Sequence, residues 1–167
     1  MITMKNVFRS MQFLLGILLF LFSFALYCST ATRTVSFIDA GELATVASTL
    51  GIAHPTGYPF FTLLSHFVTQ LPLGFSTIFQ LNLFAAFLCA LGIVCFFNFL
   101  FFFTTQFISN SQRVVTMEQR FVQFIPALCG TLLLAFSETY WSQAIAIEVY
   151  SLHTVFLSLL LLTFANA

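Results

Sequence analysis

The sequence contains very few charged residues: five Lys or Arg and five Asp or Glu among 167, or 6%. A soluble domain of this length needs far more polar surface than that charge supplies. The net charge is zero, so there is no basic surface for nucleic acid and no nucleic-acid partner is expected. The scarcity of charge therefore predicts an integral membrane protein whose first partner is the lipid bilayer.

Several catalytic motifs are also missing. The sequence has no phosphate-binding glycine loop, no H-E-x-x-H, no Cys-x-x-Cys and no G-x-S-x-G. The cysteines lie in or at the edge of apolar runs without metal-type spacing to histidine, and we interpret them as packing residues. They are Cys28, Cys89, Cys95 and Cys129. These absences argue against a soluble nucleotide-using enzyme, and we expect neither a metal nor a cofactor.

Long apolar runs are what the sequence does contain. A chain that crosses a bilayer must be helical or a closed barrel, and barrel strands alternate between apolar and polar residues. The runs here are continuous, so the predicted fold class is an all-α polytopic membrane protein. Residues 1–167 form one membrane region with about four transmembrane helices. These cover roughly residues 11–28, 78–103, 121–136 and 149–164. The third is short and contains Pro126, which predicts a tilt or a kink.

The positions of the cations predict the orientation. Lys and Arg flank short cytoplasmic loops, so the N-terminus and the 104–120 loop are expected in the cytoplasm. The outer loop 29–77 and the connection 137–148 then lie on the other face. The four inner cations are Lys5, Arg9, Arg113 and Arg120. An alternative is that the first apolar run is a signal peptide cleaved near Ser29 and Ala31.

A polar segment, Ser36 to Pro59, interrupts this apolar sequence and holds two of its five acids. Residues 39–50 read as a short interfacial helix that Asp39 can cap and Gly51 ends. A turn with two prolines follows, and Pro59 opens a second short helix that runs to about residue 71. Ionisable groups gathered at a membrane face are a functional-site hypothesis, because charge is costly there.

Asp39 and Glu42 are the first candidates for catalysis. Their spacing of three places both carboxylates on one face of the first helical turn. Near a medium of low dielectric constant, one of them should hold its proton more tightly, which suits a general base. The alternative interpretation is a capping box, since D-x-x-E before an apolar run is typical of a helix start. The two interpretations are compatible.

Other candidates for substrate binding lie nearby or in the second outer stretch. His54 and Tyr58 belong to the turn, where each has a structural alternative as a turn residue or a headgroup anchor. In the second stretch, the single tryptophan fits an aromatic belt. Glu148 lies among apolar residues, where a lone carboxylate is costly unless it is paired or faces water. The remaining candidates are Arg33, Glu138, Trp141 and Glu148.

Four segments resemble a known family. They are Phe37-Ile-Asp-Ala-Gly-Glu-Leu43 with Thr49-Leu-Gly-Ile-Ala-His-Pro-Thr-Gly-Tyr-Pro59, and later Ala135 to Ala144 followed by Glu148 to His153. This pattern is similar to the family once labelled domain of unknown function 2723, the transmembrane protein 260-like protein O-mannosyltransferases. The resemblance covers nearly the whole chain.

The resemblance implies the N-terminal part of a C-type glycosyltransferase. Such enzymes transfer a sugar, such as mannose, from a polyprenyl-phosphate donor to a protein or glycan acceptor on the non-cytoplasmic side. Their usual catalytic acid follows the first span, a position that Asp39 occupies, with Glu42 to tune or orient it. His54 and Arg33 are the groups near enough in sequence to meet the phosphate. Enzymes of this class have more spans than four, so the chain is expected to be a fragment or to be completed by another chain.

The sequence leaves alternatives for the compartment and for the function. The compartment is either the bacterial inner membrane or the endoplasmic reticulum. The runner-up function is a non-enzymatic membrane protein, a transporter piece or assembly subunit, with the outer acids binding a cation or partner. A transporter should place ionisable groups near the bilayer midplane, whereas these acids fall at its outer boundary. That position favours the enzyme. His153 lies further into the fourth span, where we expect a buried hydrogen-bonding residue, and it is the main residue that favours a transporter.

Overall fold

The computed structural model describes residues 4–36, 39–111 and 117–166, and all regular structure in these ranges is helical. The predicted all-α fold class is confirmed to that extent. The helices are α1 Met4–Thr30, α2 Ala40–Thr49, α3 Pro59–Thr69, α4 Thr77–Ser111, α5 Met117–Val122, α6 Phe124–Ala135, α7 Glu138–Ile145 and α8 Tyr150–Asn166. Arg113 and the Phe37–Ile38 pair of the family-like segment lie outside the described residues.

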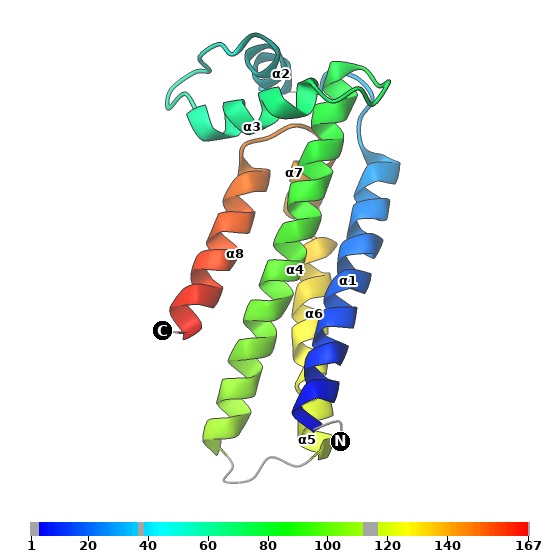
Figure 1. Cartoon of the computed structure of the whole chain (residues 1–167), viewed down its shortest axis with the longest axis vertical. Coiled ribbons are helices and arrows are strands. Elements are labelled where there is room, and N and C mark those ends of the chain that lie inside the picture. The colour runs from blue at the N-terminus through cyan, green and yellow to red at the C-terminus, as the bar shows by residue number, and fades with distance from the viewer. Residues whose placement is uncertain (1–3, 37–38, 112–116, 167) are drawn as a thin grey trace.

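The long helices run along one axis and two short helices lie across one end of the bundle (Figure 1). α4 is at the centre and contacts α1, α6, α7 and α8. α2 and α3 pack on each other and on α4, at the end opposite the N-terminus and α5 (Figure 1). The predicted outer loop therefore lies at one end of the bundle, and the N-terminus lies at the other.

Two of the predicted spans correspond to helices that are long and apolar enough to cross a membrane. These stretches are Asn6–Thr30 in α1 and Thr77–Phe107 in α4. α6 and α8 are apolar but shorter. The predicted helix over 121–136 is not continuous, because α5 ends at Val122 and α6 begins at Phe124. Pro126 has no amide hydrogen for the carbonyl of Val122, so one bond of a continuous helix is unavailable there.

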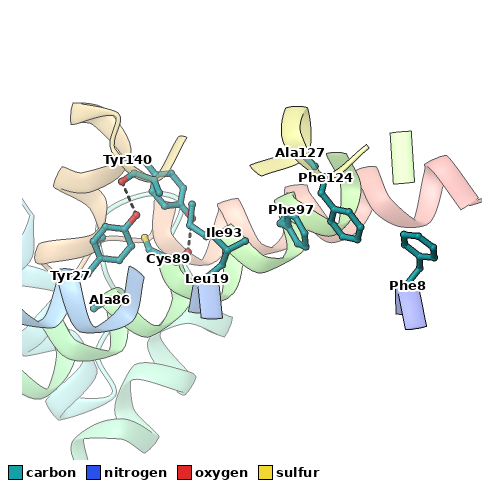
Figure 2. Close-up of a cluster of buried hydrophobic side chains, with 12 residues drawn as sticks. Phe8, Leu19, Tyr27, Ala86, Cys89, Ile93, Phe97, Phe124, Ala127 and Tyr140 are labelled. Carbon is teal, nitrogen blue, oxygen red and sulfur yellow. Dashed lines mark hydrogen bonds between the residues drawn. The ribbon is translucent and has the colours of Figure 1, made fainter. Parts of the chain in front are cut away.

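A buried core joins α1, α4, α6 and α7 (Figure 2). The Tyr27 hydroxyl donates to the Ala135 carbonyl at 2.9 Å, and the Tyr140 hydroxyl donates to the Cys89 carbonyl at 2.7 Å. Buried tyrosine needs such a partner for its hydroxyl. The short helix α7 lies within the 137–148 connection and was not predicted. Ser137 caps it, accepting from the Tyr140 amide.

Asn82 of α4 connects the two outer stretches to the bundle. Its side chain is fully buried and donates to the Thr32 carbonyl at 2.7 Å and to the Thr32 hydroxyl at 2.8 Å. It also accepts from the Ile147 amide at 2.8 Å. The Thr32 amide in turn donates to the Ile145 carbonyl at 2.9 Å. Because these bonds converge, the segments just before Arg33 and Glu148 meet at one place on α4. We call Asn82, Thr32 and Ile147 the Asn82 junction.

Candidate functional site

The first outer acid lies at the start of α2, which forms because its apolar residues fall on one face. Leu43, Val46 and Ala47 are buried in a cluster shared with α3. The helix ends where Leu50 takes a left-handed conformation, and the Gly51 amide donates to the Val46 carbonyl. α2 thus confirms the short helix predicted over 39–50.

Asp39 occupies the N-cap position of α2 but its side chain makes no capping hydrogen bond. The capping-box interpretation is therefore wrong for this pair, because Glu42 is also turned away from the helix start. Glu42 Oε1 accepts the His54 amide at 2.7 Å, and Glu42 Oε2 lies 3.1 Å from His54 Nδ1. Both oxygens of Glu42 thus contact one residue twelve positions along the chain.

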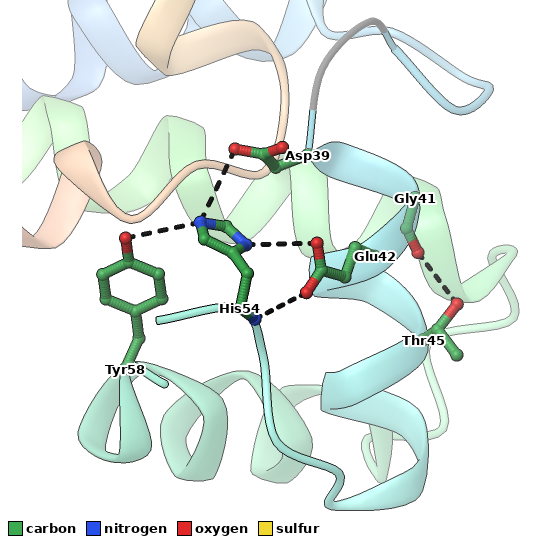
Figure 3. Close-up of polar contacts among 6 residues, drawn as sticks. All are labelled: Asp39, Gly41, Glu42, Thr45, His54 and Tyr58. Carbon is green, nitrogen blue, oxygen red and sulfur yellow. Dashed lines mark hydrogen bonds and ion pairs between the residues drawn. The ribbon is translucent and has the colours of Figure 1, made fainter. Parts of the chain in front are cut away.

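The turn after α2 holds His54 and Tyr58 in place. The Gly57 amide donates to the His54 carbonyl at 2.7 Å, and Gly57 has φ +85°, which favours glycine. Tyr58 follows at φ +42°, and Pro59 then opens α3. The Tyr58 hydroxyl lies 3.5 Å from His54 Nε2, and the two rings meet edge to face. The turn therefore presents both rings on the side that faces Asp39 (Figure 3).

Four side chains that the sequence nominated thus meet at one point: Asp39, Glu42, His54 and Tyr58. We call these four residues the outer cluster. Asp39 Oδ2 lies 3.9 Å from His54 Nε2 (Figure 3). The His54 and Asp39 side chains are 37% and 42% exposed, so solvent and a substrate can reach both. The cluster is open on one side and fixed by Glu42 on the other.

The electrostatics of the two glutamates differ. The bonds from the His54 backbone and imidazole lower the pKa of Glu42, so Glu42 stays ionised. Burial raises the pKa of Glu148, and the charge of Asp39 raises it further. Glu148 is half-buried, and it lies close enough to Asp39 and His54 for both groups to affect its pKa. The Asn82 junction explains this proximity, since it fixes the neighbouring Ile147.

Three other nominated residues have different surroundings. The Arg33 guanidinium lies over the Phe79 ring at 5.2 Å, a cation–π contact on the exposed surface. Glu138 is exposed in the first turn of α7. Trp141 is half-buried and packs against Tyr27 with ring centroids 5.5 Å apart. No hydrogen bond or ion pair of the described residues joins these three to the outer cluster.

A cavity of about 250 Å³ lies beside Tyr58, and the sequence did not predict it. It lies between α3 and α8, and its lining includes Phe60, Phe61, Leu152, His153 and Phe156. His153 is exposed, so the expectation that it is buried is wrong, and its Nδ1 lies 3.4 Å from the Val149 carbonyl oxygen. Because α3 and α8 are far apart in sequence, no local spacing could have signalled this cavity.

The outer cluster also has the spacing of a cation site. One ligand atom each from Asp39, Glu42 and His54 lies within 4.8 Å of the others. Glu42, however, already uses both oxygens on His54, so the described contacts hold the cluster together without an ion. Chemically, the arrangement is an exposed carboxylate facing an imidazole whose other nitrogen is fixed by a second carboxylate. Such a group accepts and passes protons.

Comparison with known proteins gives a consistent result. Residues 39–167 match the family described as the N-terminal domain of the protein O-mannosyl-transferase TMEM260. The chain is 35% identical to protein O-mannosyl-transferase TMEM260 of Mus musculus over 139 residues, which is 82% of this chain and 17% of that protein. It is 44% identical to the tmem260 protein O-mannosyl-transferase of Dictyostelium discoideum over 55 residues, 33% of this chain and 7% of that protein. No solved structure matches.

Proposed function

We propose, because this chain belongs to the TMEM260 N-terminal domain family of protein O-mannosyl-transferases, that it is part of a multi-pass membrane glycosyltransferase. In this proposal it transfers a sugar, mannose in the first instance, from a polyprenyl-phosphate donor to a protein or glycan acceptor. The reaction takes place on the non-cytoplasmic side of a bacterial inner membrane or the endoplasmic reticulum. The matched stretch spans 17% of the mouse relative, so the remainder of such an enzyme lies in other segments.

One observation supports this proposal above the others: an exposed aspartate lies beside a fixed imidazole at one end of the bundle. Asp39 acts as the general base and takes the proton of the acceptor hydroxyl. The new bond joins the acceptor oxygen to sugar C1 while the bond from C1 to the phosphate oxygen breaks. The polyprenyl phosphate leaves with that electron pair and needs no protonation.

The surroundings suit such a donor. Arg33, which is exposed and lies over the Phe79 ring of α4, is the cation that we propose for the phosphate. Tyr58, Glu138, Trp141 and Glu148 are the further candidates for contacting the sugar or the acceptor. The two helices with membrane-spanning length and hydropathy support a bilayer around the bundle, which leaves the outer cluster at its boundary.

The test is Asp39→Asn in the full-length protein, assayed for sugar transfer from a polyprenyl-phosphate donor. Turnover should fall by a factor on the order of 10²–10⁴, the usual contribution of a general base, while donor binding persists. Glu118→Gln is the matched control, because Glu118 is an exposed acid of α5 at the opposite end. Near-normal turnover of Asp39→Asn would remove Asp39 from the mechanism. No sugar transfer by the unaltered full-length protein would favour the non-enzymatic alternative, in which the acids bind a cation or partner.

A second experiment tests the orientation. Single cysteines replace Thr45 on α2 and Glu118 on α5, both exposed residues, in a protein whose native cysteines are changed to alanine. A thiol reagent that does not cross membranes should label position 45 from the non-cytoplasmic side and position 118 only after permeabilisation. Labelling of position 118 from the outside, and of position 45 only after permeabilisation, would place the outer cluster in the cytoplasm. That result would contradict the proposal.

A further inference from the structure

We propose that Glu42 is a positioning residue that fixes one tautomer of His54, and that His54 Nε2 receives the proton Asp39 takes from the acceptor. This inference rests on the proposed function, because it needs Asp39 to act as a base. It extends that function by giving the proton a route away from the reacting oxygen.

The hydrogen-bond pattern determines the tautomer. Ionised Glu42 can only accept hydrogen bonds, and its lowered pKa keeps it ionised. The nitrogen 3.1 Å from Glu42 Oε2 must therefore carry a hydrogen, so His54 is protonated at Nδ1. In the neutral ring this leaves Nε2 as an acceptor, and Nε2 is the atom that faces Asp39 at 3.9 Å.

The ring orientation is fixed at two points. Glu42 accepts both from the His54 backbone amide and from its ring, so moving the ring away breaks a bond while the backbone remains held. The Tyr58 ring meets the imidazole edge-on at a centroid distance of 5.4 Å and limits its rotation. The bond from the His54 amide to Glu42 is enough to connect the turn to α2. The second bond, from the imidazole to Glu42, also fixes the orientation of the ring.

The acceptor hydroxyl gives its proton to Asp39 as the bond from its oxygen to sugar C1 forms and the bond from C1 to the phosphate oxygen breaks. Asp39 then passes that proton to Nε2, and the resulting imidazolium is paired with the Glu42 carboxylate. His54 is 37% exposed, so it releases the proton to solvent before the next turnover. The titratable groups that face His54 are Asp39 and Glu42 of α2, Tyr58 of the turn, and Glu148 before α8.

The experiment compares Glu42→Gln and His54→Gln in the full-length enzyme with Asp39 intact. Both variants should lower kcat by a factor on the order of 10–10² while the KM for the donor stays within twofold. In Glu42→Gln the new side chain presents one oxygen instead of two, so it no longer accepts from both the His54 amide and Nδ1–H. The NH2 group in place of the second oxygen can only donate to Nδ1, which favours the tautomer protonated at Nε2. Thr45→Val is the matched control one turn along α2, since the Thr45 hydroxyl bonds only to its own helix at Gly41.

A spectroscopic measurement separates positioning from a structural role. ¹⁵N NMR of labelled histidine, with the His54 signals identified by their loss in His54→Ala, should show His54 protonated at Nδ1 in the neutral wild type. Glu42→Gln should yield a mixture of tautomers, whereas Thr45→Val should not change the signals. An unaltered tautomer in Glu42→Gln would overturn the positioning role even if activity fell.

The outcomes distinguish this inference from the function on which it rests. Normal turnover of Asp39→Asn removes the base role of Asp39 and, with it, the proton transfer to His54, while the sugar transfer itself stands. Loss of turnover in Asp39→Asn together with an unchanged kcat in His54→Gln overturns only the proton transfer to His54. A raised donor KM with unchanged kcat would make His54 a phosphate contact instead. Loss of activity on chelation by EDTA, restored by Mg²⁺ or Mn²⁺, would also overturn the inference, because the cluster would then hold an ion.

Discussion

The Asn82 junction and the outer cluster both connect segments that are distant in sequence, yet they differ in exposure and in charge. Asn82 is fully buried, neutral, and bonded through both its amide nitrogen and its oxygen. The outer cluster is charged, about two-fifths exposed at Asp39 and His54, and has a loose contact of 3.9 Å between them. The hydrogen-bonding groups of the Asn82 junction are all paired within the protein, whereas Asp39 and His54 of the outer cluster can still bond to a substrate.

The comparison shows which polar groups serve the fold and which are available for chemistry. Removing one partner of a buried hydrogen bond leaves the other without water, at a cost of about 1–3 kcal/mol per group. Removing an exposed partner costs little, because water replaces it. Variants at the junction should therefore affect stability, whereas variants in the outer cluster should affect turnover.

Asn82→Leu should have the largest effect on stability. The Ile147 amide would lose its acceptor and Thr32 would lose its donor, so the free energy of unfolding should fall by about 3 kcal/mol. Thermal unfolding of the purified protein in detergent, followed by circular dichroism, measures this change.

Asn98→Leu is the matched control, the same residue type in the same helix. The Asn98 side chain is half-buried and bonds to Gln12 and to the Val94 carbonyl. Its replacement should cost about 1 kcal/mol. Equal losses for the two variants would mean that the junction is no more important than an ordinary polar pair between α1 and α4.

Gly92→Ala is the next test, because it adds a methyl group where the core has no room. A Cβ at Gly92 would lie 2.6 Å from the Tyr140 hydroxyl oxygen, which already donates to the Cys89 carbonyl. The expected loss is about 2 kcal/mol from overpacking. Gly16→Ala is the control, since its nearest neighbour would be Val94 Cγ1 at an ordinary 3.6 Å. A fall in the unfolding midpoint for Gly16→Ala but not for Gly92→Ala would contradict this packing.

The sequence predicted the helices best where composition alone decides them. The long apolar runs gave α1 and α4, and the periodicity of Leu43, Val46 and Ala47 gave α2. It was less complete where single backbone groups decide the outcome. Pro126 predicted a tilt or a kink in the third span but not a break at Gln123, and the cap of α7 by Ser137 was not predicted.

For the site, the sequence nominated the residues of the outer cluster but not their partners. Asp39 and Glu42 were expected to share the helix start, whereas Glu42 instead bonds to His54, twelve residues away. No periodicity encodes such a contact, since it depends on the length and shape of the 51–58 turn. The proximity of Glu148 likewise depends on Asn82, whose bonds to Thr32 and Ile147 join segments that no sequence spacing connects.

Glu148→Gln should raise stability at neutral pH, by less than either core variant changes it. The raised pKa means that folded Glu148 binds its proton more tightly than the unfolded chain does. The stabilisation from that proton is therefore full below the unfolded pKa and is lost as the pH rises through the folded pKa. Glutamine imitates the protonated form, so the advantage of the variant over wild type should shrink on acidification. A difference in midpoint that does not vary with pH would contradict this.

Protonation of Glu42 should have the smallest effect on the stability of the whole protein, although its effect on the turn around His54 should be measurable. Its lowered pKa means that its contribution is present above the unfolded pKa and is lost as the pH falls through the folded pKa. Because Glu42 is exposed, the unfolding midpoint should barely respond. The His54 amide, which donates to Glu42 Oε1, should instead lose protection against hydrogen exchange once the intrinsic pH dependence is removed. Unchanged protection of that amide through the titration of Glu42 would mean that the turn, rather than the carboxylate, holds His54 in place.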